Sequence, residues 1–285
     1  MALRRLGVLG WPVDHSRSPA MQNAALAAAG LGDAFRYERV PVTPEAFAET
    51  VAGLAAAGFA GVNVTIPHKE AALALATEAS ADARAIGAAN TLTFGAAGAI
   101  RADNTDAPGV LDALGDPLPA SALVLGAGGS ARAVAYALRA SGADVAVWNR
   151  THARAASLAD DIGVRAVAER VPAEVLVNCT SVGLRNSSAT FKDLPLNADE
   201  IREYACVVDL VYRDGGTGLL QEAERQGCRV VDGLEILVRQ GAKSFEIWTG
   251  RTPSLEVMRR AARSVEPLPE SPPSPTGRLG AGGRG

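Results

Sequence analysis

Residues 121–151 read SALVLGAGGSARAVAYALRASGADVAVWNRT, and this stretch decides the fold. A short apolar run over 122–125 has the length of a buried strand. A glycine turn follows it, and the Ala-rich segment 130–140 has the composition of a helix. Gly142 ends that helix, and a second apolar run over 145–148 leads into a polar turn. The order strand, glycine turn, helix, strand is typical of the βαβ unit that holds a dinucleotide.

The glycine turn itself has the chemistry of a pyrophosphate site. Gly126 lets the chain leave the strand tightly, and Gly128 has no Cβ, so a pyrophosphate can approach the backbone. Ala131 is small enough for helix and strand to pack closely, and the helix N-terminus adds free N–H groups and a partial positive charge. We therefore predict a dinucleotide site here; the alternative is an ordinary glycine-rich turn that binds nothing.

The end of the second strand indicates which dinucleotide binds. An NAD site usually carries an acid about 20 residues on, but this chain has Asn149 and Arg150 there, with Arg154 one helical turn later. An arginine pairs with a 2′-phosphate, and each charge-assisted hydrogen bond contributes about 1.5–3 kcal/mol, where about 1.4 kcal/mol is tenfold in affinity. The sequence predicts NADP(H) over NAD(H) by at least about tenfold, unless both arginines are merely solvated.

Composition sets the class of protein. The 285 residues suffice for two domains, and 48% hydrophobic residues fit an α/β protein. The net charge of −3, with basic residues scattered along the chain, gives no reason to expect a nucleic-acid partner. The three cysteines form no C-x-x-C pair, so we expect no metal site and a reducing compartment.

Location and assembly are less constrained by the sequence. There is no signal-peptide layout and no apolar run of about 18 residues, so we expect a cytoplasmic protein without a membrane partner. The oligomeric state stays open, with a homodimer as one option.

Strands and helices alternate along the rest of the chain. Before residue 115 we expect strands at 6–9, 36–40, 62–66, 90–94 and 99–102, and helices at 20–29, 44–57, 69–77, 81–86 and 107–114. This part has no phosphate-type glycine turn, which indicates a separate α/β domain. After residue 151 we expect strands at 175–179, 206–211 and 229–231, and helices at 153–162, 219–226, 234–248 and 253–263. The last two have no strand between them, so we expect them to pack back on the first domain.

Several polar residues stand where these elements begin or end. Ser18 precedes Pro19 as the expected N-cap of a helix, and with Ser16 it offers hydroxyls to an anion. Asn63 and Thr65 share one strand face. Lys69 opens a helix, where its charge opposes the macrodipole and hints at a function, although the local sequence alone favours a solvated lysine.

Nine stretches in order resemble the shikimate dehydrogenase family. They are GWP at 10–12, HSRSP at 15–19, NVTIPHK at 63–69, ANT at 89–91, NTD at 104–106, GAGG at 126–129, NRT at 149–151, DGL at 232–234 with Gln240, and FEIWTG at 245–250. The match runs from about Leu6 to Arg263. One departure follows Tyr212, where the family usually has a proline two places on and this chain has Asp214.

The resemblance implies two α/β domains separated by a cleft. An N-terminal substrate domain over 1–106 would be completed by C-terminal helices over 240–264, and a Rossmann-type NADP-binding domain would span 107–239. The Pro- and Gly-rich tail 265–285 lies outside the family pattern, and its composition predicts disorder. The implied reaction is the NADPH-dependent, reversible reduction of 3-dehydroshikimate to shikimate on the route to aromatic amino acids.

The resemblance also implies residue roles. Ser16 and Ser18 would hold the substrate carboxylate, and its ring and hydroxyls would contact Asn63, Thr65, Asn90, Asp106, Tyr212 and Gln240. Lys69 and Asp106 would form the catalytic pair, although the local sequence alone favours Asp106 as a helix N-cap. The implied cofactor site comprises Gly126, Ala127, Gly128, Gly129, Ser130, Ala131, Asn149, Arg150, Thr151, Arg154, Thr180, Leu210 and Gly233.

Two other functions compete with this one. A quinate/shikimate dehydrogenase would share the fold, accept more substrates and often use NAD, which Arg150 and Arg154 argue against. A non-catalytic NADPH-binding sensor would be expected to lack Lys69 or Asp106, and both are present.

Overall fold

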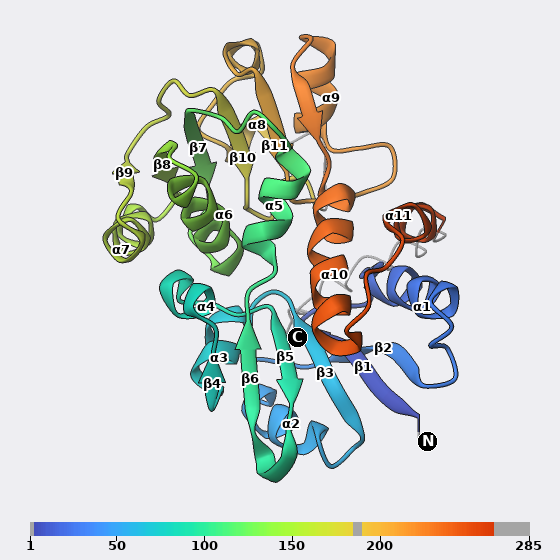
Figure 1. The fold of residues 1–285 in the computed structure, drawn as a ribbon. Helices are drawn as coiled ribbons and strands as arrows, with labels where there is room; N and C mark the ends of the chain where they lie inside the picture. Colours follow the sequence, from blue (N-terminus) through green and yellow to red (C-terminus); the bar gives the residue numbers. More distant parts are fainter. Residues whose placement is uncertain (1–2, 185–189, 265–285) are drawn as a thin grey trace, which may run out of the picture.

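Two six-stranded sheets, each packed against helices, form two lobes of the molecule (Figure 1). The structure is a computed structural model that describes residues 3–184 and 190–264. The tail at 265–285, for which we expect disorder, lies outside the described residues. We use "first lobe" for the sheet that contains the N-terminal strand and "second lobe" for the other.

The first sheet is mixed, with strand order β2-β1-β3-β5-β6-β4. Its strands are β1 Arg4–Gly10, β2 Phe35–Pro41, β3 Phe59–Val64, β4 Glu78–Ala79, β5 Thr91–Phe94 and β6 Ile100–Asp103. β1 pairs in parallel with β2 and β3, whereas β5 runs antiparallel to β3 and β6. The helices of this part are α1 Ser18–Ala28, α2 Phe47–Leu54, α3 Lys69–Ala74 and α4 Ala81–Ile86.

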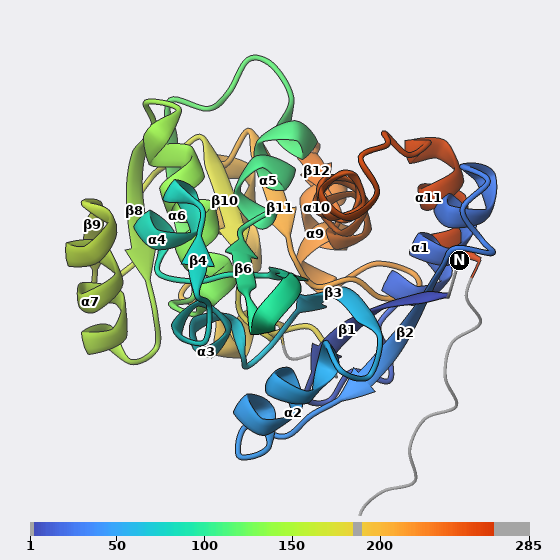
Figure 2. The same cartoon turned by 60° about the horizontal axis from the view of Figure 1, so that its bottom comes forward.

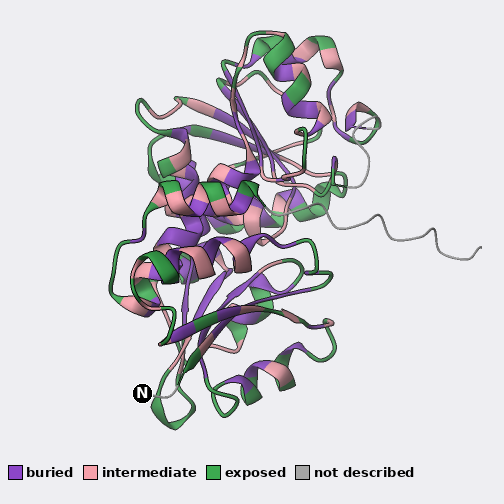
Figure 3. Cartoon of the chain, turned by 90° about the vertical axis from the view of Figure 1, so that its right-hand side faces the viewer, coloured by how far each residue is buried: buried purple, intermediate pink, exposed green. Residues whose placement is uncertain are grey.

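Side-chain alternation gives the first sheet a core on each face. Leu6 and Val8 of β1 pack with α1, whereas Leu9 belongs to the core beneath α2. Every residue of β3 is buried, as expected of a strand covered on both sides. Figure 3 shows the resulting concentration of buried residues along the strands of both sheets.

The second sheet is entirely parallel, with strand order β12-β11-β10-β7-β8-β9. Its strands are β7 Ser121–Leu125, β8 Asp144–Trp148, β9 Arg165–Val167, β10 Val175–Asn178, β11 Cys206–Asp209 and β12 Arg229–Val231. Its helices are α6 Gly129–Ala140, α7 His152–Ile162, α8 Thr190–Asp193 and α9 Gly218–Arg225. This is the doubly wound order of dinucleotide-binding sheets, and it reverses between β7 and β10, which is where such sheets bind ligands.

Two helices connect the lobes. α5 (Asp106–Leu114) leads out of β6 and packs against α10 (Gly233–Thr249). Gly109 permits this approach, because an added Cβ would lie 2.9 Å from the Cβ of Gln240. α11 (Leu255–Arg263) then lies beside α1 of the first lobe (Figure 2). The expected domain limit after residue 239 falls within α10, and the limits stay predictions.

Some local expectations are wrong. Ser18 is not an N-cap: α1 begins at Ser18 itself, because Arg17 already has helical dihedral angles and makes no side-chain cap. The strand expected at 62–66 ends at Val64, and the helix expected at 44–57 spans only Phe47–Leu54. The short elements β4, β9 and α8 were not expected, since two to four residues carry no periodicity.

Candidate active site between the lobes

A cleft of about 190 Å³ lies between the lobes and is lined by both of them. This is more than ten times the space that one buried water needs, so the cleft has room for a small ligand. All eight residues expected to bind substrate line it: Ser16, Ser18, Asn63, Thr65, Asn90, Asp106, Tyr212 and Gln240. From the second lobe it receives Ser130, Thr180 and Leu210, with Gly233 at the start of α10.

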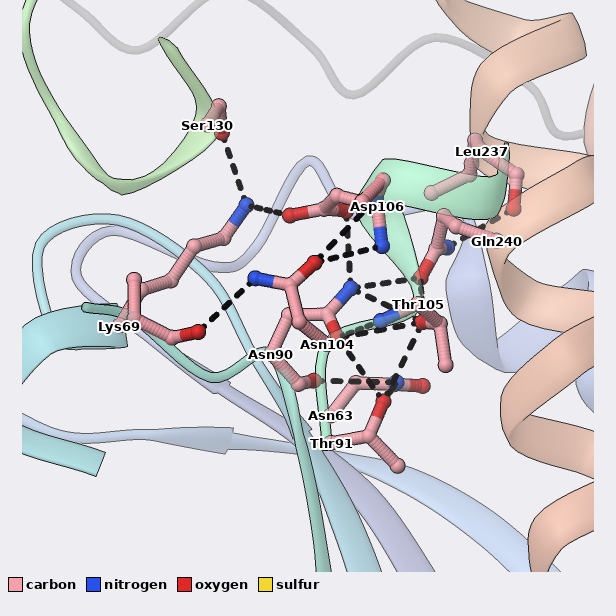
Figure 4. A network of polar contacts seen from close by, with 12 residues as sticks. Asn63, Lys69, Asn90, Thr91, Asn104, Thr105, Asp106, Ser130, Leu237 and Gln240 are labelled. Carbon is pink, nitrogen blue, oxygen red and sulfur yellow. Dashed lines mark hydrogen bonds and ion pairs between the residues drawn. The ribbon is translucent and has the colours of Figure 1, made fainter. Parts of the chain in front are cut away.

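Lys69 is the central charged group of the cleft (Figure 4). Its Nζ donates to Asp106 Oδ2 at 2.6 Å and to Ser130 Oγ at 2.8 Å, and only 9% of either Lys69 or Asp106 is exposed. The pairing offsets the unfavourable position of a cation at the first residue of α3. Lys69 is therefore not the solvated surface lysine that its local sequence favours. Two of the three ammonium protons are engaged, so one remains to be donated to a ligand.

Asp106 is held in place by two asparagines. Asn90 Nδ2 donates to Asp106 Oδ1 at 2.8 Å. Asn104 Oδ1 accepts from the backbone N–H groups of Asp106 and Ala107, so Asn104 satisfies the start of α5. Asp106 is the first residue of α5 and does not cap it, which leaves its carboxylate for Lys69.

The floor of the cleft is a connected amide network. Asn63 Nδ2 donates to the carbonyl of Asn90 and to Thr91 Oγ1, both at 3.2 Å, and its Oδ1 accepts from the hydroxyl of Tyr37 at 2.8 Å. Gln240 Oε1 of α10 accepts from Asn90 Nδ2 at 3.3 Å. Such a network fixes the direction in which each side chain presents its remaining donors and acceptors.

The turn at Ser16 and Ser18 meets the second lobe at Tyr212. Burial raises the pKa of Tyr212, against hydrogen bonds with the Arg17 backbone and the Ser16 side chain that favour the ionised phenolate. The phenol therefore stays protonated at neutral pH and can donate a hydrogen bond. Arg17 is 7% exposed, and it donates to Asp214 Oδ1 at 2.6 Å and to the carbonyl of Ala262 at 3.0 Å.

The glycine turn has the geometry expected of it. Gly126 has φ of 114°, a left-handed value that favours glycine, and an added Cβ would lie 3.2 Å from the carbonyl carbon of Cys179. Ala131, in the first turn of α6, is completely buried. Arg150 and Arg154 are exposed beyond β8, and within the described part of the chain neither has an ion-pair partner. These features fit an anionic dinucleotide, whose 2′-phosphate the two arginines would bind.

A buried carboxylate joins the two loops on the cofactor side. Asp209 accepts from Asn178 Nδ2 at 2.9 Å, from Val211 N at 3.0 Å and from Thr217 Oγ1 at 2.7 Å. Asn178 Oδ1 in turn accepts from Thr180 Oγ1 at 2.7 Å. This network positions Thr180 and the loop that carries Leu210 and Tyr212.

The structure separates the predicted cofactor residues into two groups. One group lines the cleft: Ser130, Thr180, Leu210 and Gly233. The other lies outside it, in the glycine turn with the start of α6 and between the end of β8 and the first turn of α7: Gly126, Ala127, Gly128, Gly129, Ala131, Asn149, Arg150, Thr151 and Arg154. Sequence reasoning assigned no role to Tyr37, Asp209 or Ser244, which contact the site through side-chain hydrogen bonds. A carboxylate in the otherwise apolar strand β11 was the available signal for Asp209, whereas Tyr37 lies among charged residues of β2, which gave no such signal.

The described residues contain neither a metal-binding cluster nor a membrane-spanning helix. Across residues 3–184 and 190–264, no three His, Cys, Asp or Glu side chains are grouped so that they could hold a metal ion. Of the helices described, none is long and apolar enough to cross a membrane.

The sequence matches three family models. Residues 8–92 match the shikimate dehydrogenase substrate binding domain, residues 112–179 match shikimate / quinate 5-dehydrogenase, and residues 233–263 match the shikimate 5′-dehydrogenase C-terminal domain. One relative, an NADP(+) shikimate dehydrogenase of Thermus thermophilus, is 47% identical over 264 residues, which cover 91% of this chain and 97% of the relative.

Solved structures agree with the sequence matches. A shikimate 5-dehydrogenase of Thermus thermophilus, in complex with NADP(H) and shikimate, superposes with a TM-score of 0.84 at 47% identity, covering 92% of this chain and 99% of that one. A 5-ketofructose reductase of Gluconobacter superposes with a TM-score of 0.80 at 31% identity, covering 92% and 99%. On these matches, which extend over nine-tenths of its length, the chain belongs to the shikimate dehydrogenase family.

Proposed function

We propose that the protein catalyses the reversible, NADPH-dependent reduction of 3-dehydroshikimate to shikimate, a step toward the aromatic amino acids. One observation carries the proposal: a buried Lys69–Asp106 pair lies in a cleft that also receives the first turn of the dinucleotide helix α6. Its relatives, named NADP(+) shikimate dehydrogenases, support the same activity.

The residues divide the work of the reaction. NADPH, when bound, supplies the hydride. Charge then develops on the substrate oxygen, and Lys69 stabilises that charge and donates a proton, an effect worth about 10²–10⁴-fold. Asp106 keeps the ammonium charged and oriented, and Asn90 holds the carboxylate in turn. Ser16 and Ser18, with the hydroxyl of Tyr212 beside them, provide donors suited to a carboxylate.

The cofactor preference rests on the second lobe. Gly128 leaves open space for a pyrophosphate, and Arg150 and Arg154 supply two guanidinium groups for a 2′-phosphate. We expect a KM for NADP⁺ at least about tenfold lower than for NAD⁺.

Quinate is the competing substrate, since one of the matching family models covers quinate as well as shikimate enzymes. The name of the 5-ketofructose reductase indicates that a related fold acts on another ketone, so the fold alone does not determine the substrate.

A four-way assay tests the proposal: shikimate or quinate, with NADP⁺ or NAD⁺, followed by the appearance of reduced nicotinamide. We expect efficient turnover only with shikimate and NADP⁺. Comparable kcat/KM for quinate would favour the broader enzyme, and binding of NADPH without turnover of either acid would favour the sensor. For such an enzyme the cytoplasm remains the expected location, and the homodimer stays a prediction.

A further inference from the structure

The dinucleotide turn contains two residues that its fingerprint does not require. The pattern uses Gly126, Gly128 and Ala131, so Gly129 and Ser130 occupy variable positions. In the structure both of them face Lys69, a residue of the opposite lobe (Figure 4 shows the Ser130 contact).

The absence of a Cβ at Gly129 makes room for the side chain of Lys69. An added Cβ would lie 2.7 Å from Lys69 Cβ and 3.2 Å from Lys69 Cδ. The closer atom is next to the backbone of α3, so it cannot move aside as the end of a flexible side chain could. At Gly128, by contrast, an added Cβ would meet no atom of the described residues within 4 Å, which is the space left for a pyrophosphate.

Ser130 sets the direction of the lysine. Its hydroxyl oxygen accepts one proton of the ammonium at 2.8 Å, while Asp106 accepts another at 2.6 Å. With two of three protons engaged from opposite lobes, the third has one direction left, into the cleft. The Ser130 hydroxyl keeps its own proton, which it can donate to a dinucleotide oxygen bound at the N-terminus of α6.

We propose that Gly129 and Ser130 are positioning residues for Lys69, so that the dinucleotide turn orients the proton donor as well as holding the cofactor. The inference rests on the proposed function, in which Lys69 protonates the substrate oxygen. It assigns the second lobe a part in the proton transfer in addition to cofactor binding.

Kinetics of Ser130 variants test the inference. Ser130→Ala removes a hydrogen bond to a charged group, so we expect kcat for 3-dehydroshikimate reduction to fall about tenfold while KM for that substrate changes less than about threefold. Ser130→Thr keeps the hydroxyl and should restore most of the loss. Gly129→Ala should lower kcat similarly. Ser141→Ala, at the other end of α6, is the matched control and should behave as wild type.

A double-mutant cycle separates positioning from cofactor contact. In a Lys69→Ala background, Ser130→Ala should cause no further loss of kcat, because the group it positions is gone. A kcat within twofold of wild type, an equal loss in the Lys69→Ala background, or a change confined to the KM for NADPH would overturn the inference. If wild type itself fails to reduce 3-dehydroshikimate, the proposed function fails instead.

The same cycle scored by urea unfolding requires no substrate. The unfolding equilibrium constant of the double variant should differ severalfold from the value expected if the effects of Lys69→Ala and Ser130→Ala were independent. Independent effects of the two substitutions would overturn the inference whatever the enzyme reduces.

Discussion

At the scale of single residues, the chemistry depends on a few buried polar groups. Lys69 sits among Asp106, Ser130 and the turn at Gly129, which come from both lobes. The local sequence alone favoured a solvated lysine, because a helix start gives no sign of what another lobe brings to it. Only the ordered set of family motifs indicated the role of Lys69. Its partners Asp106 and Ser130 are distant in the sequence, so the local spacing of residues could not predict these contacts.

Lys69→Ala should lower kcat at least about 100-fold with KM little changed, because the ammonium acts on charge that develops in the transition state. Steady-state rates with NADPH and 3-dehydroshikimate measure this. Lys243→Ala removes a surface lysine of α10 that pairs with Asp112, and it should leave kcat unchanged. Wild-type turnover in Lys69→Ala would exclude Lys69 as the proton donor.

Asp209 should make stability fall as the pH rises. Burial raises the pKa of its carboxyl to about 6, against three hydrogen bonds that favour the ionised form. A carboxyl with a raised folded-state pKa stabilises the fold below the unfolded pKa and loses that contribution as the pH passes about 6. Between pH 4 and 7 the unfolding free energy of wild type relative to Asp209→Asn should therefore fall by up to roughly 3 kcal/mol.

Urea unfolding at several pH values measures this difference. Asp144→Asn is the control of opposite sign, because the Arg165 hydrogen bond lowers the pKa of Asp144. A difference between wild type and Asp209→Asn that does not vary with pH would contradict the expected titration.

At the scale of elements, apolar periodicity predicted most strands and helices. β12 matches its expected range, and β7, α6 and β8 lie within one residue of theirs, since Gly126 and Gly142 punctuate the chain there. Capping at α1 was predicted wrongly, because the backbone at Arg17 turns helical before Ser18. The packing of one element against another could not be predicted from the sequence. One example is Gly61 of β3, which lies against Trp248 of α10.

Gly61→Ala should destabilise the protein by about 1–3 kcal/mol, as overpacking usually does. The added Cβ would clash with Trp248 Nε1 and lie 2.6 Å from the carbonyl oxygen of Leu92, the two atoms that form a 3.2 Å hydrogen bond between α10 and β5. Urea unfolding measures the loss. Gly53→Ala, in α2 with open space around it among the described residues, should instead stabilise by roughly 0.5–1 kcal/mol. Equal effects at both sites would contradict this account of the packing.

At the scale of the whole molecule, the lobes touch on the side of the cleft that holds Ser16 and Ser18. Arg17 reaches from the first lobe to Asp214 of the second, and its guanidinium lies 6.0 Å from the ring centroid of Tyr212. Asp214 occupies the position where a proline is usual in the family, and the sequence alone left this loop open. The structure gives the loop an ionic attachment to the turn that carries the two serines.

Asp214→Ala should raise KM for shikimate about three- to tenfold and change kcat less than twofold, because Arg17 loses a partner worth about 1 kcal/mol and the serine turn loosens. Kinetics in the oxidative direction measure both constants. Glu203→Ala breaks the Arg170 pair on the second lobe and should change neither. An unchanged KM in Asp214→Ala would mean that the ion pair does not order the turn.

The return of α11 to α1 has a consequence for synthesis on the ribosome. Leu6 of β1 and Met21 of α1 share a core with Phe245 and Met258. The apolar side chains of the N-terminal segment, which is synthesised first, are therefore covered only when the C-terminal helices have been synthesised. The strands of the parallel sheet between residues 121 and 231 pair only with one another, and its core takes in α5, which is made earlier, and only Ile236 from the part made later. The middle of the polypeptide can thus reach its native form while the N-terminal third is still partly exposed, which makes that third the part most in need of chaperones.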